Sequence, residues 1–315
     1  MPGLHDEIIE AMTELAGGEH PGFRAAHAKG LFCSGRFTPA PGAHRLSRAA
    51  HLQDQPVDVI ARLSNGGGNP EAKDAQRLEG RGLAVKFHLP DGSAADIVAL
   101  TLPVFFVRDP DSFLGFLRAR KPDPGETDPN MERLGAFFAE HPETAKSLQL
   151  ILPTLVPPVS YATCAYNSLH AFALVNADGE RRYIRYRFIP EAGEQVLPEE
   201  DQKDASPDYL QDDLRGRLDG GSIAFKLVAR LAKEGDSLDD PTLPWPEDRE
   251  QVELGRLELT ALLPDAEADG NVVVFDPMNV TDGVETSDDQ ILHARSQAYS
   301  ISAARRAAAL AETRV

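Results

Sequence analysis

Cysteine is scarce in this sequence, since only Cys33 and Cys164 occur among its 315 residues. Two cysteines make neither a disulfide framework nor a zinc-binding spacing, so we expect two buried thiols in a reducing compartment. No apolar run approaches the length that crosses a membrane. The first residues, Met1 to Glu7, also lack the basic and apolar regions of a signal peptide. We therefore expect a cytoplasmic protein that does not enter a membrane.

Positive charge is also in short supply. The chain has 32 Lys and Arg against 50 Asp and Glu, which gives a formal net charge of −18 at pH 7. An acidic surface repels phosphate groups, so nucleic acid and anionic membranes are poor partners, and neutral or cationic small molecules are favoured. The hydrophobic fraction of 42% is ordinary for a globular chain, so a sizeable core can form.

Alternation of apolar and polar residues is the dominant pattern along the chain. It predicts strands at 28–37, 57–64, 82–89, 97–102, 168–176, 181–189, 223–231 and 257–261. Turns with the sequence Asp-Gly join two of these pairs as hairpins. Helical spacing predicts helices at 8–15, 111–119, 132–150, 208–218 and 289–313. About eight mostly antiparallel strands can close into a barrel, and without a composition break one domain is expected.

The predicted final helix carries a pair of residues suited to iron chemistry. Arg295 and Tyr299 lie four residues apart and so share a helix face. A guanidinium stabilises a neighbouring phenolate, and tyrosinate is a known axial ligand of haem iron. Asp289 lies six residues earlier and can hold Arg295 through His170. Taken alone, the pair is most simply an ordinary contact on a helix surface.

Arginines elsewhere in the chain strengthen the haem hypothesis. Arg306 follows Tyr299 by two helical turns on the same face. Together with Arg24 and Arg62 it offers guanidiniums for two haem propionates, because arginine pairs with carboxylates in a bidentate manner. His27, three residues after Arg24, is by itself an ordinary structural histidine. Lys29 is expected to be a solvated strand residue.

Segments that span most of the chain occur in a fixed order. They are FRAAHAKG (23–30), ARLSNGGG (61–68), GRGLAVKFHLPDG (80–92), LPVFFVRDP (102–110), LHAFALVNADGE (169–180), VVFDPMNVTDGVETSDDQIL (273–292) and RSQAY (295–299). From Phe23 to Arg306 the sequence thereby resembles the haem catalases, and more closely the short catalase-related peroxidases. One such segment would be a weak signal, but a collinear set is specific.

The resemblance implies a role for each matched residue. His27 is implied as the distal histidine above the haem, with Ser64 as its hydrogen-bond partner. Phe106 and Phe113 fall where aromatic residues line the distal pocket. On the opposite, proximal side of the haem the implied residues are the iron ligand Tyr299, its supporting Arg295, and the further network members His170 and Asp289. The implied propionate-binding residues are Arg24, Arg62 and Arg306.

The sequence also departs from the family pattern. Where full catalases carry a distal asparagine, we expect Thr101 to face His27. A carboxamide donates a hydrogen bond from a fixed position, whereas a threonine hydroxyl is shorter and rotates. Dismutation of hydrogen peroxide is therefore expected to be poor.

The resemblance further implies an α+β fold built on an eight-stranded antiparallel β-barrel of the catalase type, with inserted and C-terminal helices. We expect the chain to lack the N-terminal arm and C-terminal domain of large catalases, which opens the haem to organic molecules. Residues 1–315 are expected to form one haem-binding domain, with an N-terminal helix in 1–20, the barrel in 21–265, and a wrapping loop and proximal helix in 266–315. A homodimer or another small homo-oligomer is expected.

The function expected from this resemblance is that of a haem peroxidase. It would use haem b, cleave hydrogen peroxide or organic hydroperoxides, and oxidise a small organic electron donor, with weak or no catalase activity. Three alternatives remain: a true catalase of minimal size, a non-enzymatic haem-binding barrel and a hydroperoxide isomerase. The isomerase ranks low because that branch has a threonine before the distal histidine, where this chain has Ala26.

Overall fold

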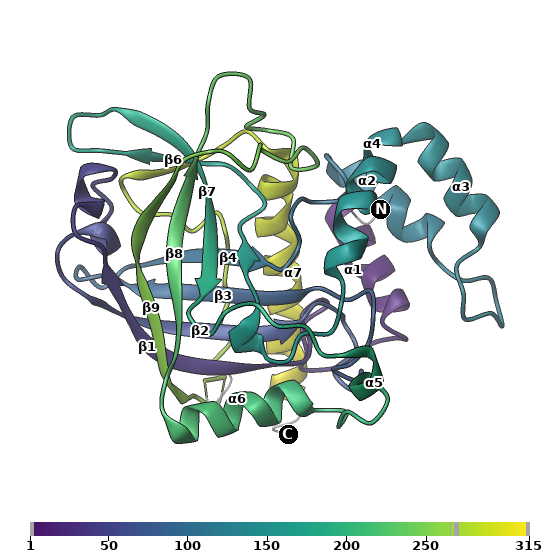
Figure 1. Ribbon diagram of the computed structural model, residues 1–315. Coiled ribbons are helices and arrows are strands. Elements are labelled where there is room, and N and C mark those ends of the chain that lie inside the picture. The colour runs from purple at the N-terminus through teal and green to yellow at the C-terminus, as the bar shows by residue number, and fades with distance from the viewer. Residues whose placement is uncertain (1–2, 265, 268–270, 313–315) are drawn as a thin grey trace.

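In the computed structural model of the chain, which describes residues 3–264, 266–267 and 271–312, the alternating segments pair into a sheet that closes on itself (Figure 1). The strands of the ring, each antiparallel to its neighbours, are β1 (Gly30–Pro39), β2 (Val57–Asn65), β3 (Arg81–His88), β4 (Ala94–Leu100), β5 (Tyr166–Asn167), β7 (Arg181–Pro190), β8 (Ile223–Leu231) and β9 (Gln251–Leu262). Pairing of β9 with β1 completes the circle. The expected antiparallel barrel of eight strands is confirmed for the described residues.

The barrel interior is filled by one face of each strand. On β3, Leu83, Val85 and Phe87 are fully buried, whereas the alternate residues Gly82, Ala84 and Lys86 point outward. Burial of this apolar set supplies the main stabilising free energy of the barrel, at about 25 cal/mol per Å². The outward face of β1 to β4 is therefore free to build a site, and the interior is not.

Helices lie at the ends and one side of the barrel. They are α1 (Leu4–Leu15), α2 (Pro110–Ala119), α3 (Met131–Glu140), α4 (Pro142–Ile151), α5 (Glu199–Gln202), α6 (Tyr209–Gly220) and α7 (Gln290–Glu312), with short 3₁₀ turns at Ala43–Arg45, Ala50–Leu52, Leu152–Thr154 and Tyr161–Thr163. Helix α7, drawn yellow in Figure 1, packs against α1 and α2. In this view α3 lies farther from the barrel than the other helices, whereas Ile151 of α4 packs against Leu102 and Leu169.

The structure corrects the predicted elements at several points. The single helix expected over 132–150 is two helices, because Pro142 lacks an N–H and excludes His141 from helical geometry, leaving it at φ −125° and ψ 68°. The strand expected over 168–176 is interrupted at Leu169, whose φ is +65°. A strand β6 (Phe172–Val175) remains, and β10 (Val284–Thr286), which the sequence did not predict, pairs with it.

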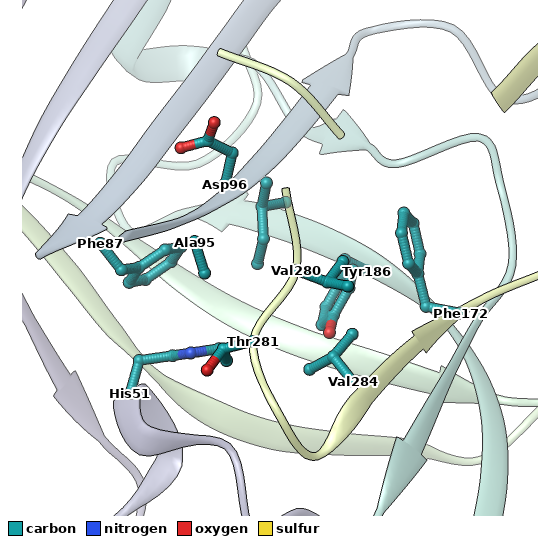
Figure 2. A pocket seen from close by; sticks show the side chains of 10 residues that line it. His51, Phe87, Ala95, Asp96, Phe172, Tyr186, Val280, Thr281 and Val284 are labelled. Atoms are coloured by element: carbon teal, nitrogen blue, oxygen red, sulfur yellow. The ribbon is translucent and has the colours of Figure 1, made fainter. Parts of the chain in front are cut away.

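A small cavity lies inside the barrel between His51, Phe87 and Tyr186 (Figure 2). Its volume of about 10 Å³ has room for about one water molecule. Neither ring nitrogen of His51 has a hydrogen-bond partner, and burial lowers the pKa of this histidine to about 4. None of the site residues predicted from the sequence lines the cavity.

Cys33 and Cys164 are buried free thiols. No helix among the described residues is long and apolar enough to traverse a bilayer. The expected boundaries at 265 and 313 lie outside the described residues.

Candidate functional site

His27 lies on the outer wall of the barrel in an unusual backbone conformation. Its φ of +56° is in the left-handed region, which non-glycine residues seldom adopt. Backbone bonds hold it there, since its N–H donates to Gly66 O at 3.1 Å and the Ala28 N–H donates to Gly67 O at 3.0 Å. The ring then packs directly over Gly82 of β3. A residue that is strained and held in this way is a candidate for function.

The ring of His27 has a defined partner and a defined charge state. Its Nδ1 lies 3.0 Å from Oγ of Ser64, at the end of β2. Burial, together with the positive charges of Arg62, Arg295 and Arg24, lowers the pKa of His27 to about 3. The ring is therefore neutral near pH 7, and it can accept a proton.

Arg62 holds the backbone next to His27 through two of its three guanidinium nitrogens. Its Nη1 donates to His27 O at 2.7 Å and its Nη2 donates to Ala28 O at 3.1 Å. Burial and the neighbouring Arg24 lower the pKa of Arg62 to about 9. Arg62 thus fixes the backbone of His27, while its buried Nε has no partner.

Thr101 does not face His27, so this expectation was wrong. Its hydroxyl accepts the backbone N–H of Arg81 at 3.0 Å. Leu100 is instead the direct cross-strand partner of Gly82. Paired residues of an antiparallel ladder share a face, and successive residues alternate. Leu100 therefore lies on the face that carries His27.

Helix α7 carries the second half of the site. Nε and Nη2 of Arg295 donate to the phenol oxygen of Tyr299 at 3.0 and 2.6 Å. Nη1 of Arg295 lies 3.0 Å from Nε2 of His170, whose Nδ1 lies 2.6 Å from Asp289 Oδ2. The chain Asp289–His170–Arg295–Tyr299 predicted from the sequence is thus continuous in space.

Asp289 also explains where the helix begins. Its Oδ1 accepts the backbone N–H groups of Ile291 and Leu292 at 2.9 and 3.2 Å. These are N–H groups of the first helical turn, which otherwise lack partners. Burial lowers the pKa of His170, although the Asp289 carboxylate opposes the shift. One carboxylate therefore both starts α7 and orients His170.

Arg24 and Arg306 come together around a carboxylate. Arg24 binds Glu267 with two hydrogen bonds of 3.0 and 2.8 Å, and Arg306 Nη1 binds the same carboxylate at 2.5 Å. Both guanidiniums also donate to Val273 O. Two arginines that bind one carboxylate have the chemistry needed to bind a haem propionate. The buried Nε atoms of Arg62 and Arg306 have no hydrogen-bond partner.

Apolar side chains line the space around these polar groups. The outward residues Phe32, Ala84, Val98 and Leu100 are only partly buried. The guanidiniums of Arg24 and Arg62 lie 5.2 and 5.5 Å from the centroid of the Phe32 ring. An apolar wall with arginines at one edge and a histidine and a tyrosine within the same region has the chemistry that a haem requires.

The two predicted pocket aromatics belong to one cluster. Phe106 and Phe113 have ring centroids 5.5 Å apart, and both contact Phe105. Phe105 in turn lies 6.5 Å from the ring of His170. Phe105 and Phe106 also pack, as Leu100 does, against the buried residues around Leu102. The aromatic cluster therefore lies between these residues and His170.

Sequence reasoning missed Gly82, Leu100 and Glu267 as members of the site. Gly82 had a usable signal, because a glycine within an otherwise alternating strand indicates close approach of another group. Leu100 and Glu267 carry no such signal, since an apolar strand residue and a loop glutamate are common anywhere.

Comparison with known proteins agrees with this geometry. The sequence model of the catalase family matches residues 6–312. A catalase-related peroxidase of Mycolicibacterium paratuberculosis is 40% identical over 297 residues, which is 94% of this chain and 93% of the relative. Another catalase-related peroxidase, from Synechococcus elongatus, is 34% identical and covers 96% of this chain and 88% of the relative.

Solved structures show the same fold at lower identity. A fungal catalase superposes with a TM-score of 0.80 at 24% identity, over 91% of this chain and 60% of that one. Catalase A from Saccharomyces cerevisiae gives a TM-score of 0.80 at 22% identity, over 95% and 64%. The chain thus spans less than two thirds of these catalases. On its sequence match and its fold, this chain belongs to the catalase family.

Proposed function

We propose that this protein is a haem-dependent peroxidase that cleaves hydrogen peroxide or organic hydroperoxides and oxidises small organic donors. The observation that carries the proposal is the placement of a neutral, partnered His27 in the same site as the Arg295–Tyr299 pair. A barrel that only stored haem or a lipophile would need no distal base. The names of the two full-length relatives support the same activity.

His27 acts as the acid–base group. Its Nδ1 is engaged by Ser64, which leaves Nε2 to accept a proton from a bound peroxide and to deliver it to the departing oxygen. Because the pKa of His27 is low, the ring is neutral before each turnover and returns the proton readily. Leu100, on the same face as His27, keeps this side of the site apolar.

The residues of α7 would hold the cofactor from the other side. Tyr299 would ligate the iron of haem b, Arg295 would stabilise the phenolate, and Asp289 and His170 would fix Arg295. Arg24 and Arg306, with the Nε of Arg62, would bind the propionates. When bound, the haem supplies the redox-active iron that takes two oxidising equivalents from the peroxide. Two one-electron donors and two protons complete the reaction, giving water and, from an organic hydroperoxide, an alcohol.

A true catalase of minimal size is the second candidate, because it needs the same His27, Ser64 and Tyr299. Leu100 disfavours it, since an aliphatic side chain donates no hydrogen bond to a second peroxide. We further propose one haem domain over the chain, assembled as a homodimer or another small homo-oligomer.

Absorption spectroscopy of the purified protein tests the proposal. We expect the purified protein to show a ferric haem spectrum, and Tyr299→Phe should alter that spectrum. Added peroxide should change the parent spectrum, and a phenolic donor should then restore the resting spectrum. His27→Gln should leave the resting spectrum intact and slow the response to peroxide by at least about 100-fold. Failure to bind haem would overturn the proposal, and sustained oxygen evolution from peroxide without donor oxidation would favour the catalase.

A further inference from the structure

We propose that Asp74 is a positioning residue that fixes His27 and Ser64 relative to each other. This inference rests on the proposed function, in which those two residues form the acid–base pair. His27 and Ser64 lie on separate segments, one before β1 and one at the end of β2. The backbone ladder of β1 with β2 joins the two segments, and Asp74 adds a side-chain link behind the site.

Side chains beside each member of the pair reach the same carboxylate oxygen. Lys29, two residues after His27, places Nζ 2.8 Å from Asp74 Oδ1. Asn65, the residue after Ser64, places Nδ2 2.8 Å from the same atom. Asp74 thus joins the two segments through an ion pair with Lys29 and a hydrogen bond from Asn65.

Asp74 is itself fixed from several directions. Its Oδ2 accepts the backbone N–H of Leu210 in α6 at 2.9 Å. Its own N–H donates to Pro207 O at 2.8 Å, and its carbonyl accepts Nη2 of Arg81 at 2.6 Å. The side chain of Asp74 is 0% exposed. A carboxylate held in this way is a rigid anchor, because every contact is made in a low-dielectric interior.

The partners of Asp74 are equally constrained. Lys29, expected from the sequence to be solvated, is 5% exposed, and its Nζ also contacts Asp208 Oδ1 at 2.7 Å and the carbonyls of Ala72 and Pro207 at 2.8 Å. Asn65 Oδ1 accepts the Tyr161 hydroxyl at 2.7 Å. A buried ion pair contributes little net stability but does favour one arrangement over others, which is what a positioned acid–base pair requires.

The barrel provides a matched control for the loss of a buried carboxylate. Lys86 Nζ binds Asp96 at 2.6 and 2.8 Å, and Asp96 is 5% exposed. Asp96→Asn therefore removes a comparable ion pair without touching the segments of His27 or Ser64. Asp96 also accepts the Asp276 N–H and the Asn279 side-chain amide, so its partners lie in a different segment. Asp74→Asn removes the negative charge of the carboxylate that Lys29 and Asn65 both contact.

Amide hydrogen exchange and peroxide kinetics of the haem-loaded variants test the inference. For Asp74→Asn we expect amides in 24–29 and 64–68 to exchange at least about tenfold faster, with Asp96→Asn leaving them unchanged. We also expect kcat/KM for peroxide to fall by about 100-fold, because a displaced catalytic group loses its reactive geometry. The resting haem spectrum and the KM for the donor should stay as in the parent.

Two outcomes overturn the inference: unchanged exchange in both segments, or an equal effect of Asp96→Asn on exchange and kinetics. If the parent protein consumes no peroxide, the proposed function fails, whereas the exchange data still decide whether Asp74 holds the two segments. If Asp74→Asn does not fold, the double variant Lys29→Gln with Asp74→Asn removes both charges together. The double variant should show the same faster amide exchange in both segments. Unchanged exchange in the double variant would also count against the role of Asp74.

Discussion

Gly82 of β3 lies against the ring of His27 so closely that no other residue fits there. A Cβ atom at position 82 would meet Cε1 of His27 at 2.7 Å and Nδ1 at 2.8 Å. The same atom would approach Oγ of Ser64 at 3.1 Å. Because Gly82 has no side chain, the ring of His27 can lie directly against β3 and within reach of Ser64.

Gly82→Ala should therefore displace the ring of His27 and leave haem binding intact. We expect peroxide cleavage to slow by about 100-fold, since the ring and its serine partner cannot both keep their places. Stopped-flow measurement of the spectral change with peroxide checks this. Gly216→Ala in α6, where a Cβ meets nothing within 4 Å, is the control and should retain full activity. Normal kinetics for Gly82→Ala would contradict the steric argument.

Leu100→Asn should increase dismutation of hydrogen peroxide, because it places a hydrogen-bond donor on the face that carries His27. We expect the rate of oxygen evolution to rise by about tenfold or more, because one well-positioned hydrogen-bond donor can change a catalytic rate by at least that factor. An oxygen electrode measures it. Thr101→Asn is the matched control, since its side chain faces the backbone of Arg81 instead. A rise in Thr101→Asn but not in Leu100→Asn would reverse the assignment of faces.

Arg306→Leu should weaken haem binding without unfolding the chain. A charge-assisted hydrogen bond contributes about 1.5–3 kcal/mol, which corresponds to about a 10- to 100-fold lower affinity. The rate at which haem transfers to an excess of apomyoglobin reports this change. Arg305→Leu, at an exposed position next to it, should transfer haem at the parent rate. Equal rates for the two variants would exclude Arg306 from the propionate site.

Stability should depend on pH through His51. Its pKa is about 4 in the folded protein and 6.5 as the ordinary value, so the folded state favours the neutral ring. Its contribution is complete above pH 6.5 and is lost as the pH falls toward 4, by about 3 kcal/mol in all. Urea unfolding at several pH values measures the slope. His51→Phe, which preserves the stacking on Phe87, should reduce the slope in this window. Part of the slope remains, because burial also lowers the pKa values of His27 and His170. An unchanged slope would contradict the role of His51.

The sequence by itself determined the features that depend on neighbours along the chain. Alternation fixed which face of β3 is buried, and a spacing of four placed Arg295 beside Tyr299 on α7. These results follow because the periods of a strand and a helix are set by local backbone geometry. The order of the matching segments along the chain also indicates the catalase family.

Only the tertiary structure decided which residues meet across the barrel. The register of β3 with β4 puts Leu100, and not Thr101, on the face of His27. A shift of one residue in that register would exchange the two, and no local pattern reveals it. Likewise Lys29 meets Asn65 and Asp74 only because β1 pairs with β2, which brings residue 29 next to a segment more than 30 residues away. Local periodicity assigns a side chain to a face, but the pairing of distant strands decides what that face contacts.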